Sequence, residues 1–425
     1  MRWKVRTRDV RRETREIVGL ILVGAFALAV EAVAAFDATA IELVAPVGGE
    51  KVTLLPEGQR ELMALPTYEA RLSALRAESN RYAQVAWRES EPVKLRWTAG
   101  NGTAPYRILV GTTPDLKDAK GYYTDKTLEW KTRGDVTDCC WTIPCANLEL
   151  GRTYYWQVIG NLKCRTWYHR SDCGCTNRPT VVRSAVASFV TDAQAPRWIA
   201  IEGRVKNIRD LGGRETRYGR RVRQGRVYRG QGLNDNSAVG DRRGRNRLTV
   251  EDVGYLTGEL GIKTDLDLRS DCETADMTAS PLGPSVKFVH RPSMSYRGIF
   301  GDEGKKVMAE NFRLFCDARN YPVYFHCIAG ADRTGALAYV LNGVLGVDRH
   351  ELETDWEATF YPRLPELRAN FSGPNYWCRL QHLADGFAKY GTPETSWNDR
   401  IELYLLDCGV TKEEIARFRE LMLEP

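Results

Sequence analysis

Residues 321–335 read YPVYFHCIAGADRTG, and this stretch decides the fold of the second half of the chain. Val323 to Phe325 form a short apolar run after Pro322, which predicts a buried strand. Apolar residues at helical i, i+3 and i+4 spacing follow, and Gly346 stands where a helix would end; they are Leu337, Val340, Leu341, Val344 and Leu345. Residues 327–333, called the phosphate loop below, are therefore expected to connect a strand to a helix N-terminus.

A loop in this position suits an anion. A helix N-terminus offers free N–H groups and a partial positive charge. Gly330 and the small Ala329 let the backbone approach a bound anion closely. The expected phosphate-binding residues are Ile328, Ala329, Gly330, Ala331, Asp332 and Arg333.

Cys327 is the expected nucleophile of this loop. The positive field of the helix favours its thiolate, which is the nucleophilic form. Arg333 follows in a C-x5-R pattern, and its guanidinium can fork onto two phosphate oxygens. Thr334 can hydrogen-bond the sulfur and help it leave in a second step, whereas His326 is expected to brace the loop rather than act as a base.

These residues carry a family resemblance. The pattern H-C-x5-R-[ST], here His326 to Thr334, resembles the signature of the protein tyrosine phosphatase superfamily. The longer pattern H-C-x-x-G-x-D-R-T-G resembles the atypical bacterial tyrosine/dual-specificity phosphatases. Residues 207–213, NIRDLGG, look like the N-x-R-D-L-G-G motif of that group, and residues 267–269 look like its D-L-R segment. The resemblance covers about residues 200–425.

The resemblance implies a mechanism: a cysteinyl-phosphate intermediate, a general acid, hydrolysis by water, and no metal or cofactor. No W-P-D loop precedes Cys327, and in the bacterial group the acid is an Asp inside the loop, which maps onto Asp332. Asp302 is the second candidate, with a solvated loop residue as its alternative interpretation. Relatives often carry Lys in place of Ala331, and its absence removes a positive group that phosphoinositide specificity would use.

The two flanking motifs supply supporting residues. Asn207, Arg209 and Asp210 are expected to form a turn that braces the phosphate loop, although direct substrate contact by Arg209 is the alternative. Arg269 is expected to be a buried ion-pair partner next to Asp267.

Residues 36–192 are predicted to form a β-sandwich. Runs at 41–47, 92–97, 106–110, 153–159 and 185–190 are mostly short and rich in β-branched and aromatic residues. Residues 68–83 break this pattern with helical spacing, which predicts a helical insertion. The pattern L-x-x-G-x-x-Y-x-W-x-V at residues 148–158 resembles the tyrosine-corner strand of fibronectin type III domains.

Eleven cysteines are used in two ways. Six lie in the predicted sandwich, without the C-x-x-C pairs of a zinc site, so disulfides are favoured over a metal; they are Cys139, Cys140, Cys145, Cys164, Cys173 and Cys175. Four more accompany Cys327 and fit either two disulfides or buried thiols: Cys272, Cys316, Cys378 and Cys408.

The first 35 residues read as a secretory signal peptide. Seven Lys or Arg residues within 1–16 precede an uncharged apolar run at 17–30 and an A-x-A-like exit. A helix of that run is shorter than the ~30 Å hydrocarbon core of a bilayer. We therefore expect an exported chain, with an uncleaved membrane anchor as the alternative.

Composition sets outer limits. The chain has 425 residues, 43% of them hydrophobic and 27% charged, with a net charge of +6, which excludes disordered, collagen-like and multi-span membrane proteins. Residues 204–247 hold 14 Lys or Arg against 4 Asp or Glu, either a surface that attracts a polyanion or a solvated basic face. Nucleic acid is not an expected partner, because few aromatic residues interrupt this stretch.

We therefore predict a multidomain chain: a signal peptide (1–35), a fibronectin type III-like all-β sandwich (36–192), a linker (193–200) and an α/β tyrosine phosphatase-like domain with a central sheet flanked by helices (201–425). The predicted activity is hydrolysis of phosphotyrosine or other protein phosphomonoesters, with a phosphorylated inositol as the alternative substrate. An inactive phosphate-binding or adhesion module and a rhodanese-like sulfurtransferase are the rival hypotheses. The sandwich is expected to position or bind a ligand, and the sequence carries no signal for the oligomeric state.

Overall fold

The structure is a computed structural model that describes residues 41–77, 93–99, 102–124, 128–131, 137–143, 148–162, 181–234, 246–274, 277–359 and 377–425. The predicted signal peptide lies outside these residues. The chain divides into two compact units, each described by itself below. The first comprises Met1–Glu50, Lys94–Ile143 and Thr153–Val190, and the second comprises Lys51–Val93, Pro144–Arg152 and Thr191–Pro425.

The first unit is built from two β-sheets. One has the strand order β1-β3-β7-β6, formed by Glu42–Ala45, Lys94–Thr98, Thr137–Thr142 and Leu128–Lys131. The other has the order β2-β10-β8-β4-β5 with β9 on β8, formed by Glu50–Val52, Ala187–Thr191, Thr153–Leu162, Gly102–Gly111, Lys120–Thr124 and Val181–Arg183. Each of the five runs predicted to be strands overlaps a strand of these sheets.

Aromatic residues form the core of this unit. Trp97 of β3 and Tyr106 of β4 are buried and meet edge to face, with ring centroids 5.4 Å apart, so the two sheets share one core. Trp156 of β8 is also buried and donates its Nε1–H to the carbonyl of Pro46 at 2.8 Å. The resemblance to fibronectin type III domains stays a prediction.

The expected disulfide pairing of six cysteines is wrong for Cys140, which is a free thiol. Its cross-strand neighbours in the sheet are Arg96 and Leu128, so no cysteine stands opposite it. Cys145, Cys164, Cys173 and Cys175 lie outside the described residues.

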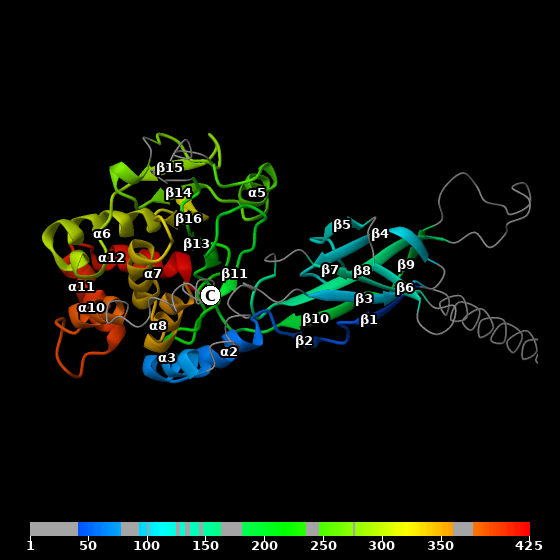
Figure 1. Ribbon diagram of the computed structural model, residues 1–425, viewed down its shortest axis with the longest axis horizontal. Helices are drawn as coiled ribbons and strands as arrows, with labels where there is room; N and C mark the ends of the chain where they lie inside the picture. The colour runs from blue at the N-terminus through cyan, green and yellow to red at the C-terminus, as the bar shows by residue number, and fades with distance from the viewer. Residues whose placement is uncertain are drawn as a thin grey trace, which may run out of the picture. The chain divides into compact units, whose positions relative to one another are not determined.

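The second unit has one six-stranded sheet with the order β11-β12-β13-β16-β14-β15 (Figure 1). These strands are Arg197–Trp198, Arg209–Asp210, Val227–Gly230, Val323–His326, Thr264–Asp267 and Lys287–His290. The pairs β13–β16, β16–β14 and β14–β15 are parallel, whereas β11–β12 and β12–β13 are antiparallel. Strand β16, which was predicted from its apolar run, therefore lies in the middle of a mostly parallel sheet.

Helices cover both faces of this sheet, as predicted. They are α5 (Val250–Gly254), α6 (Asp302–Phe315), α7 (Asp332–Val344), α8 (Arg349–Ala358), α10 (Trp377–Phe387), α11 (Trp397–Asp407) and α12 (Lys412–Met422), with short helical turns η2 (Tyr255–Glu259), η3 (Asp271–Glu273), η4 (Tyr296–Phe300) and η5 (Ala318–Asn320). Alternation along β16 divides the core: Val323 and Phe325 pack with α6, α7 and α12, whereas Tyr324 packs on the face that carries η2 (Figure 1).

The predicted helical insertion exists, but it belongs to the second unit. Helices α2 (Glu57–Ala64) and α3 (Tyr68–Ala77) precede the sheet in the chain. Leu62 and Met63 of α2 are buried in one cluster with Trp198 and Ala358, which lie far away in the chain. Arg71 of α3 donates two hydrogen bonds to Glu357 of α8, at 2.6 and 2.8 Å. The second unit therefore contains more of the chain than its motifs predict.

Within the described ranges, we find no helix that combines the length and apolar character needed to cross a membrane.

Candidate active site

The phosphate loop leaves the sheet at its centre. Strand β16 ends at His326, and helix α7 begins at Asp332. Ala331, the residue before the helix, has no side chain that could cap the first turn. The first turn of α7 therefore lacks a side-chain cap, and an anion is the ligand that a helix N-terminus favours.

Three consecutive loop carbonyls are held from outside the loop. The amide of Gly232 donates to Ile328 O at 3.1 Å. Asn207 Nδ2 donates to Ala329 O at 3.0 Å, and Arg229 Nη2 donates to Gly330 O at 2.8 Å. In a trans peptide the carbonyl and the following N–H point to opposite sides.

The N–H groups of Ala329, Gly330 and Ala331 consequently point away from these donors. They are called the cradle below, and the residue types predict that it binds an anion. Because all three donors belong to the surrounding fold, the cradle exists before any anion binds.

Gly330 is needed for a reason beyond close approach to an anion. Its φ is +67°, and a Cβ atom there would lie 2.3 Å from Gly230 O. The loop therefore packs against the end of β13, and only glycine fits between them.

Cys327 lies beneath this cradle and is 3% exposed. Burial alone would raise the pKa of its thiol. The hydroxyl and amide of Thr334 and the charge of Arg333 outweigh burial and lower the Cys327 pKa below its ordinary value. The buried Thr334 hydroxyl has no hydrogen-bond partner among the described residues, and its effect on the Cys327 pKa places it near the sulfur. The site therefore favours the thiolate.

Arg333 is held in place by Glu273, a residue that the sequence analysis did not select. Arg333 Nη1 and Nη2 donate to Glu273 Oε2 and Oε1 at 2.5 and 3.1 Å. Glu273 Oε2 also accepts from the amide and hydroxyl of Ser270 at 2.8 and 2.7 Å. Burial would raise the pKa of Glu273, but Arg333 and Ser270 lower it to about 2. A planar guanidinium held by a fixed carboxylate keeps its remaining N–H groups for an anion.

His326 and the D-L-R segment lie under the loop as a buried charge network. His326 Nε2 is 3.1 Å from Asp265 Oδ1, and its Nδ1 is 3.2 Å from the carbonyl oxygen of Cys327. Burial lowers the pKa of His326, but Asp267 and Asp265 outweigh it and raise the pKa above its ordinary value. Arg269 is paired with Asp267 at 2.6 Å, and neither residue is exposed to solvent. These contacts fit a bracing role.

Within the N-x-R-D-L-G-G motif, Asn207 is the residue that hydrogen-bonds the phosphate loop. Asn207 has a left-handed φ of 63° and reaches the loop carbonyls, while Arg209 is fully buried and bonds Asp355 Oδ1 at 2.9 Å. A buried Arg209 has no surface for a substrate, so the bracing interpretation fits. Asp210 holds the following turn, since it accepts the amides of Gly212 and Gly225 at 2.8 and 2.7 Å.

The two acid candidates lie in different places. Asp332 is the first residue of α7, and its charge raises the pKa of Cys327, which places it within electrostatic reach of the sulfur. Asp302 is exposed in the first turn of α6, a helix position rather than the expected loop, and its charge acts on Lys305. Of the two candidates, only Asp332 acts on the Cys327 pKa, and it therefore stays the first candidate.

Most described arginines of the basic stretch bind other parts of the same unit. Arg220 and Arg223 donate to the main-chain carbonyls of Glu424 and Leu423 at 2.5 and 2.7 Å. Arg217 pairs with Asp399. Arg242, Arg243 and Arg245 lie outside the described residues. The prediction that this stretch forms a solvated basic face therefore needs revision. Many of its arginine side chains bind carbonyls or carboxylates of the same unit instead of facing solvent.

Three of the four other cysteines of this unit form no disulfide, and the side chain of Cys378 lies outside the part of the chain that the structure describes. Cys272, Cys316 and Cys408 are free thiols, and burial raises the pKa of both Cys316 and Cys408 to about 12. Among the described residues, no group of His, Cys, Asp or Glu is arranged to hold a metal ion.

Glu273, Arg229 and Asp355 are the site residues that sequence reasoning missed. Glu273 follows Arg269 by four residues, so the D-L-R motif could have drawn attention to it. Arg229 was hidden among the other arginines of the basic stretch. Asp355 lies on α8 and carries no local signal.

Comparisons with known proteins give a family and a relative that this part of the chain resembles. The family model described as tyrosine phosphatase family matches residues 200–424. A protein of Cupriavidus necator, provisionally named a tyrosine-protein phosphatase, is 28% identical over 222 residues, which cover 44% of this chain and 70% of that protein.

A solved structure is similar at a much lower level. The core catalytic domain of the PP-IP phosphatase SIW14 from S. cerevisiae, in complex with citrate, has a TM-score of 0.24 and 13% sequence identity, covering 32% of this chain and 73% of that chain. Likeness at that level carries no argument about the substrate.

Replacing Glu273 by Gln should weaken oxyanion binding. The amide cannot neutralise Arg333, so the guanidinium loses its fixed orientation, and the Kd for orthovanadate should rise about tenfold. Isothermal titration would measure it, with Glu303→Gln on the exposed first turn of α6 as the control. Tighter binding in the Glu273 variant would mean that this carboxylate competes with the anion instead of positioning its partner.

Replacing Thr334 by Val should make Cys327 less acidic. The hydroxyl favours the thiolate, so its loss raises the thiol pKa, and a higher pH is then needed for ionisation. A hydrogen bond to a charged group is worth ~1.5–3 kcal/mol, which corresponds to a shift of about one pH unit or more. The rate of Cys327 alkylation by iodoacetamide against pH, followed on its peptide by mass spectrometry, reports the midpoint. Thr257→Val is the control, and equal midpoints in the two variants would contradict the assignment.

Proposed function

The chain belongs to the tyrosine phosphatase family through residues 200–424, and on that premise we propose that it is an exported, cysteine-dependent hydrolase of phosphomonoesters. One observation carries the proposal. A buried thiol, an uncapped helix N-terminus and a clamped guanidinium meet in one cradle, where Arg333 and Thr334 both act on the Cys327 sulfur. Phosphoryl transfer needs this combination of positioning and charge neutralisation.

The proposed first step is attack by the Cys327 thiolate on phosphorus. The bond between phosphorus and the ester oxygen breaks, and Asp332 donates its proton to the departing alcohol or phenol. The cradle amides and Arg333 stabilise the charge on the equatorial phosphoryl oxygens. The products are a cysteinyl phosphate and the free hydroxyl compound.

The proposed second step is hydrolysis of the cysteinyl phosphate. Asp332, now a carboxylate, takes a proton from water, and the resulting oxygen nucleophile attacks phosphorus. The sulfur–phosphorus bond breaks, inorganic phosphate leaves, and the Thr334 hydroxyl stabilises the returning thiolate. Asp332 ends the cycle protonated.

Phosphotyrosine and other protein phosphomonoesters are the proposed substrates, on the resemblance of the loop and of the two flanking motifs. The absence of Lys at Ala331 weighs against a polyanionic inositol substrate. Export is proposed from the leader sequence, and a fibronectin type III-like ligand-binding role is proposed for residues 36–192. Turnover of phosphotyrosine peptides, phosphothreonine peptides and inositol phosphates, measured side by side, would separate the substrate classes.

Replacing Cys327 by Ser should abolish turnover but retain oxyanion binding. The hydroxyl of serine is a far weaker nucleophile at neutral pH, whereas the cradle amides and Arg333 are unchanged. Hydrolysis of 4-nitrophenyl phosphate and titration with vanadate would measure the two properties. Cys316→Ser is the matched control, because a serine hydroxyl can still donate to Phe312 O or Glu414 O. Substantial activity in the Cys327 variant would rule out the mechanism.

Replacing Asp332 by Asn should affect poor leaving groups most. A general acid contributes about 10²–10⁴-fold, and its contribution grows with the pKa of the departing hydroxyl. We expect kcat for phenyl phosphate to fall by at least about 100-fold, and kcat for 4-nitrophenyl phosphate to fall much less. Asp302→Asn is the control. If the Asp302 variant shows the leaving-group dependence and the Asp332 variant does not, the roles are reversed.

A further inference from the structure

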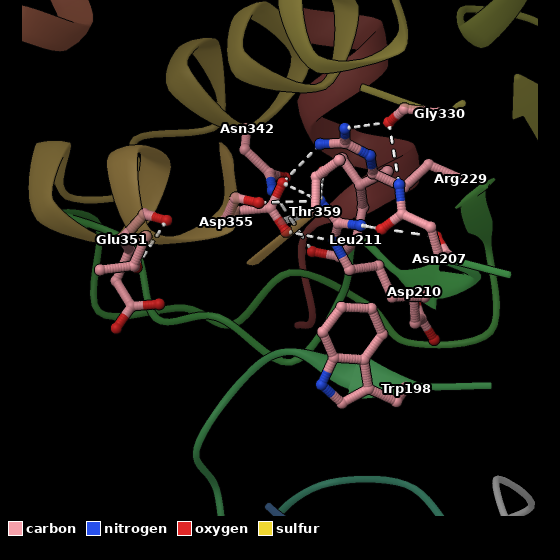
Figure 2. A network of polar contacts seen from close by, with 12 residues as sticks. Trp198, Asn207, Asp210, Leu211, Arg229, Gly330, Asn342, Glu351, Asp355 and Thr359 are labelled. Atoms are coloured by element: carbon pink, nitrogen blue, oxygen red, sulfur yellow. Dashed lines mark hydrogen bonds and ion pairs between the residues drawn. The ribbon is translucent and has the colours of Figure 1, made fainter. Parts of the chain in front are cut away.

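Behind the phosphate loop, three buried arginines converge on one carboxylate, Asp355 of α8 (Figure 2). Arg209 Nε and Arg214 Nη2 each donate to Asp355 Oδ1 at 2.9 Å, and Arg229 Nη1 donates to Oδ2 at 2.6 Å. All four residues are at most 4% exposed. Three buried guanidinium groups therefore share the Asp355 carboxylate, and Arg214 Nε also lies 3.7 Å from Glu351 Oε2.

Such a cluster is poor support for stability by itself. Removing several charges from water is costly, and buried ion pairs are often no better than apolar packing. A buried charge cluster can instead serve to orient a functional group such as the phosphate loop. That role requires a contact between the cluster and the loop.

Arg229 makes that contact. Its Nη1 is bonded to Asp355, and its Nη2 donates to Gly330 O at 2.8 Å (Figure 2). The guanidinium is planar and rigid, so fixing one arm fixes the direction of the other. The carbonyl of Gly330 is then held toward Arg229, and the N–H of Ala331 in the same peptide is held toward the cradle.

The other two arginines hold the carboxylate rather than the loop. Arg209 also donates to Asp355 O at 2.8 Å and to Thr359 Oγ1 at 3.0 Å, and its guanidinium lies over the Trp198 ring at 5.3 Å. Arg214 also donates to Leu211 O at 3.1 Å. Asp355 is consequently fixed on both oxygens, and burial, which would raise its pKa, is outweighed by the three arginines, which hold the pKa well below its usual range.

We propose that Asp355, acting through Arg229, is a positioning residue of the phosphate loop that aims the Ala331 N–H at the bound phosphoryl group. The proposal rests on the proposed function, since it assumes that the loop binds the phosphoryl group of a substrate. The charge on Cys327 also reaches Arg229: burial and Arg209 lower the pKa of Arg229 to about 9, while Asp355 and Cys327 act in the opposite direction.

Helix α8 offers a matched control. Glu357 lies two residues after Asp355, is also buried, and is bonded by two nitrogens of the buried Arg71 at 2.6 and 2.8 Å. Like the Asp355–Arg229 pair, it is a buried ion pair between an arginine and a carboxylate of α8. Unlike that pair, it does not bond the phosphate loop. Loss of either ion pair should lower stability, whereas only loss of the Asp355–Arg229 pair should change the cradle.

The experiment compares Arg229→Lys with Arg71→Lys, and Asp355→Asn with Glu357→Gln, in the full chain. The Kd for orthovanadate, kcat and KM for 4-nitrophenyl phosphate, and the melting temperature are measured for each variant. We expect a rise of about 10- to 100-fold in the vanadate Kd and a matching fall in kcat/KM for Arg229→Lys and Asp355→Asn. The Arg71 and Glu357 variants should change only the melting temperature. Where Asp355→Asn does not fold, Asp355→Glu, which keeps the charge and displaces it by one methylene, is expected to show a smaller change in the same direction.

Two results would overturn the proposal. If Arg229→Lys and Arg71→Lys change the vanadate Kd equally, the cluster only stabilises the fold. If Asp355→Asn tightens vanadate binding, its carboxylate acts as a repelling charge rather than through Arg229. A wild-type protein that neither binds vanadate nor hydrolyses the ester would instead contradict the proposed function itself.

Discussion

The positive end of helix α7, placed against a buried sulfur, is the interaction on which the rest of the catalytic unit depends. Burial alone would keep Cys327 protonated and inert, as it does at Cys316 and Cys408. Thr334 and Arg333 reverse that tendency because both belong to the first turn of α7 and both approach the sulfur. The direction of the Cys327 pKa shift therefore follows from where the helix begins.

The phosphate loop has no regular secondary structure of its own, so its shape comes from its surroundings. Gly232 and Arg229 each hold one carbonyl and Asn207 holds two, and the three residues come from different points of the segment 207–232. A loop held in this way does not need to rearrange when charge develops on the phosphoryl group, which is the condition for efficient electrostatic catalysis. The same logic applies to Arg333, whose orientation is set by Glu273 before substrate arrives.

Many charged side chains of this unit are bound to other groups within the unit. Arginines that look like a basic surface in the sequence instead bind a buried carboxylate or main-chain carbonyls near the C-terminus. Helix α8 connects this interior to the N-terminal half of the chain, since Glu357 bonds Arg71 of α3 and Ala358 packs with α2. The catalytic unit is therefore assembled from segments on both sides of the predicted domain boundary.

The sequence alone determined the strand, loop and helix of residues 321–345, the place of Cys327 and Arg333 in one loop, and the burial of Arg269 in an ion pair. These features are local. The period of the apolar residues, the positions of glycines and the spacing within a motif all depend on residues that are close together in the chain. Glu273, Arg229 and Asp355 required the tertiary structure. Their partners lie 60, 101 and 126 residues away in the chain, and no local pattern encodes a contact between such distant segments. The docking of α2 and α3 was missed for the same reason: an apolar helix face predicts burial, but only packing decides which surface covers it.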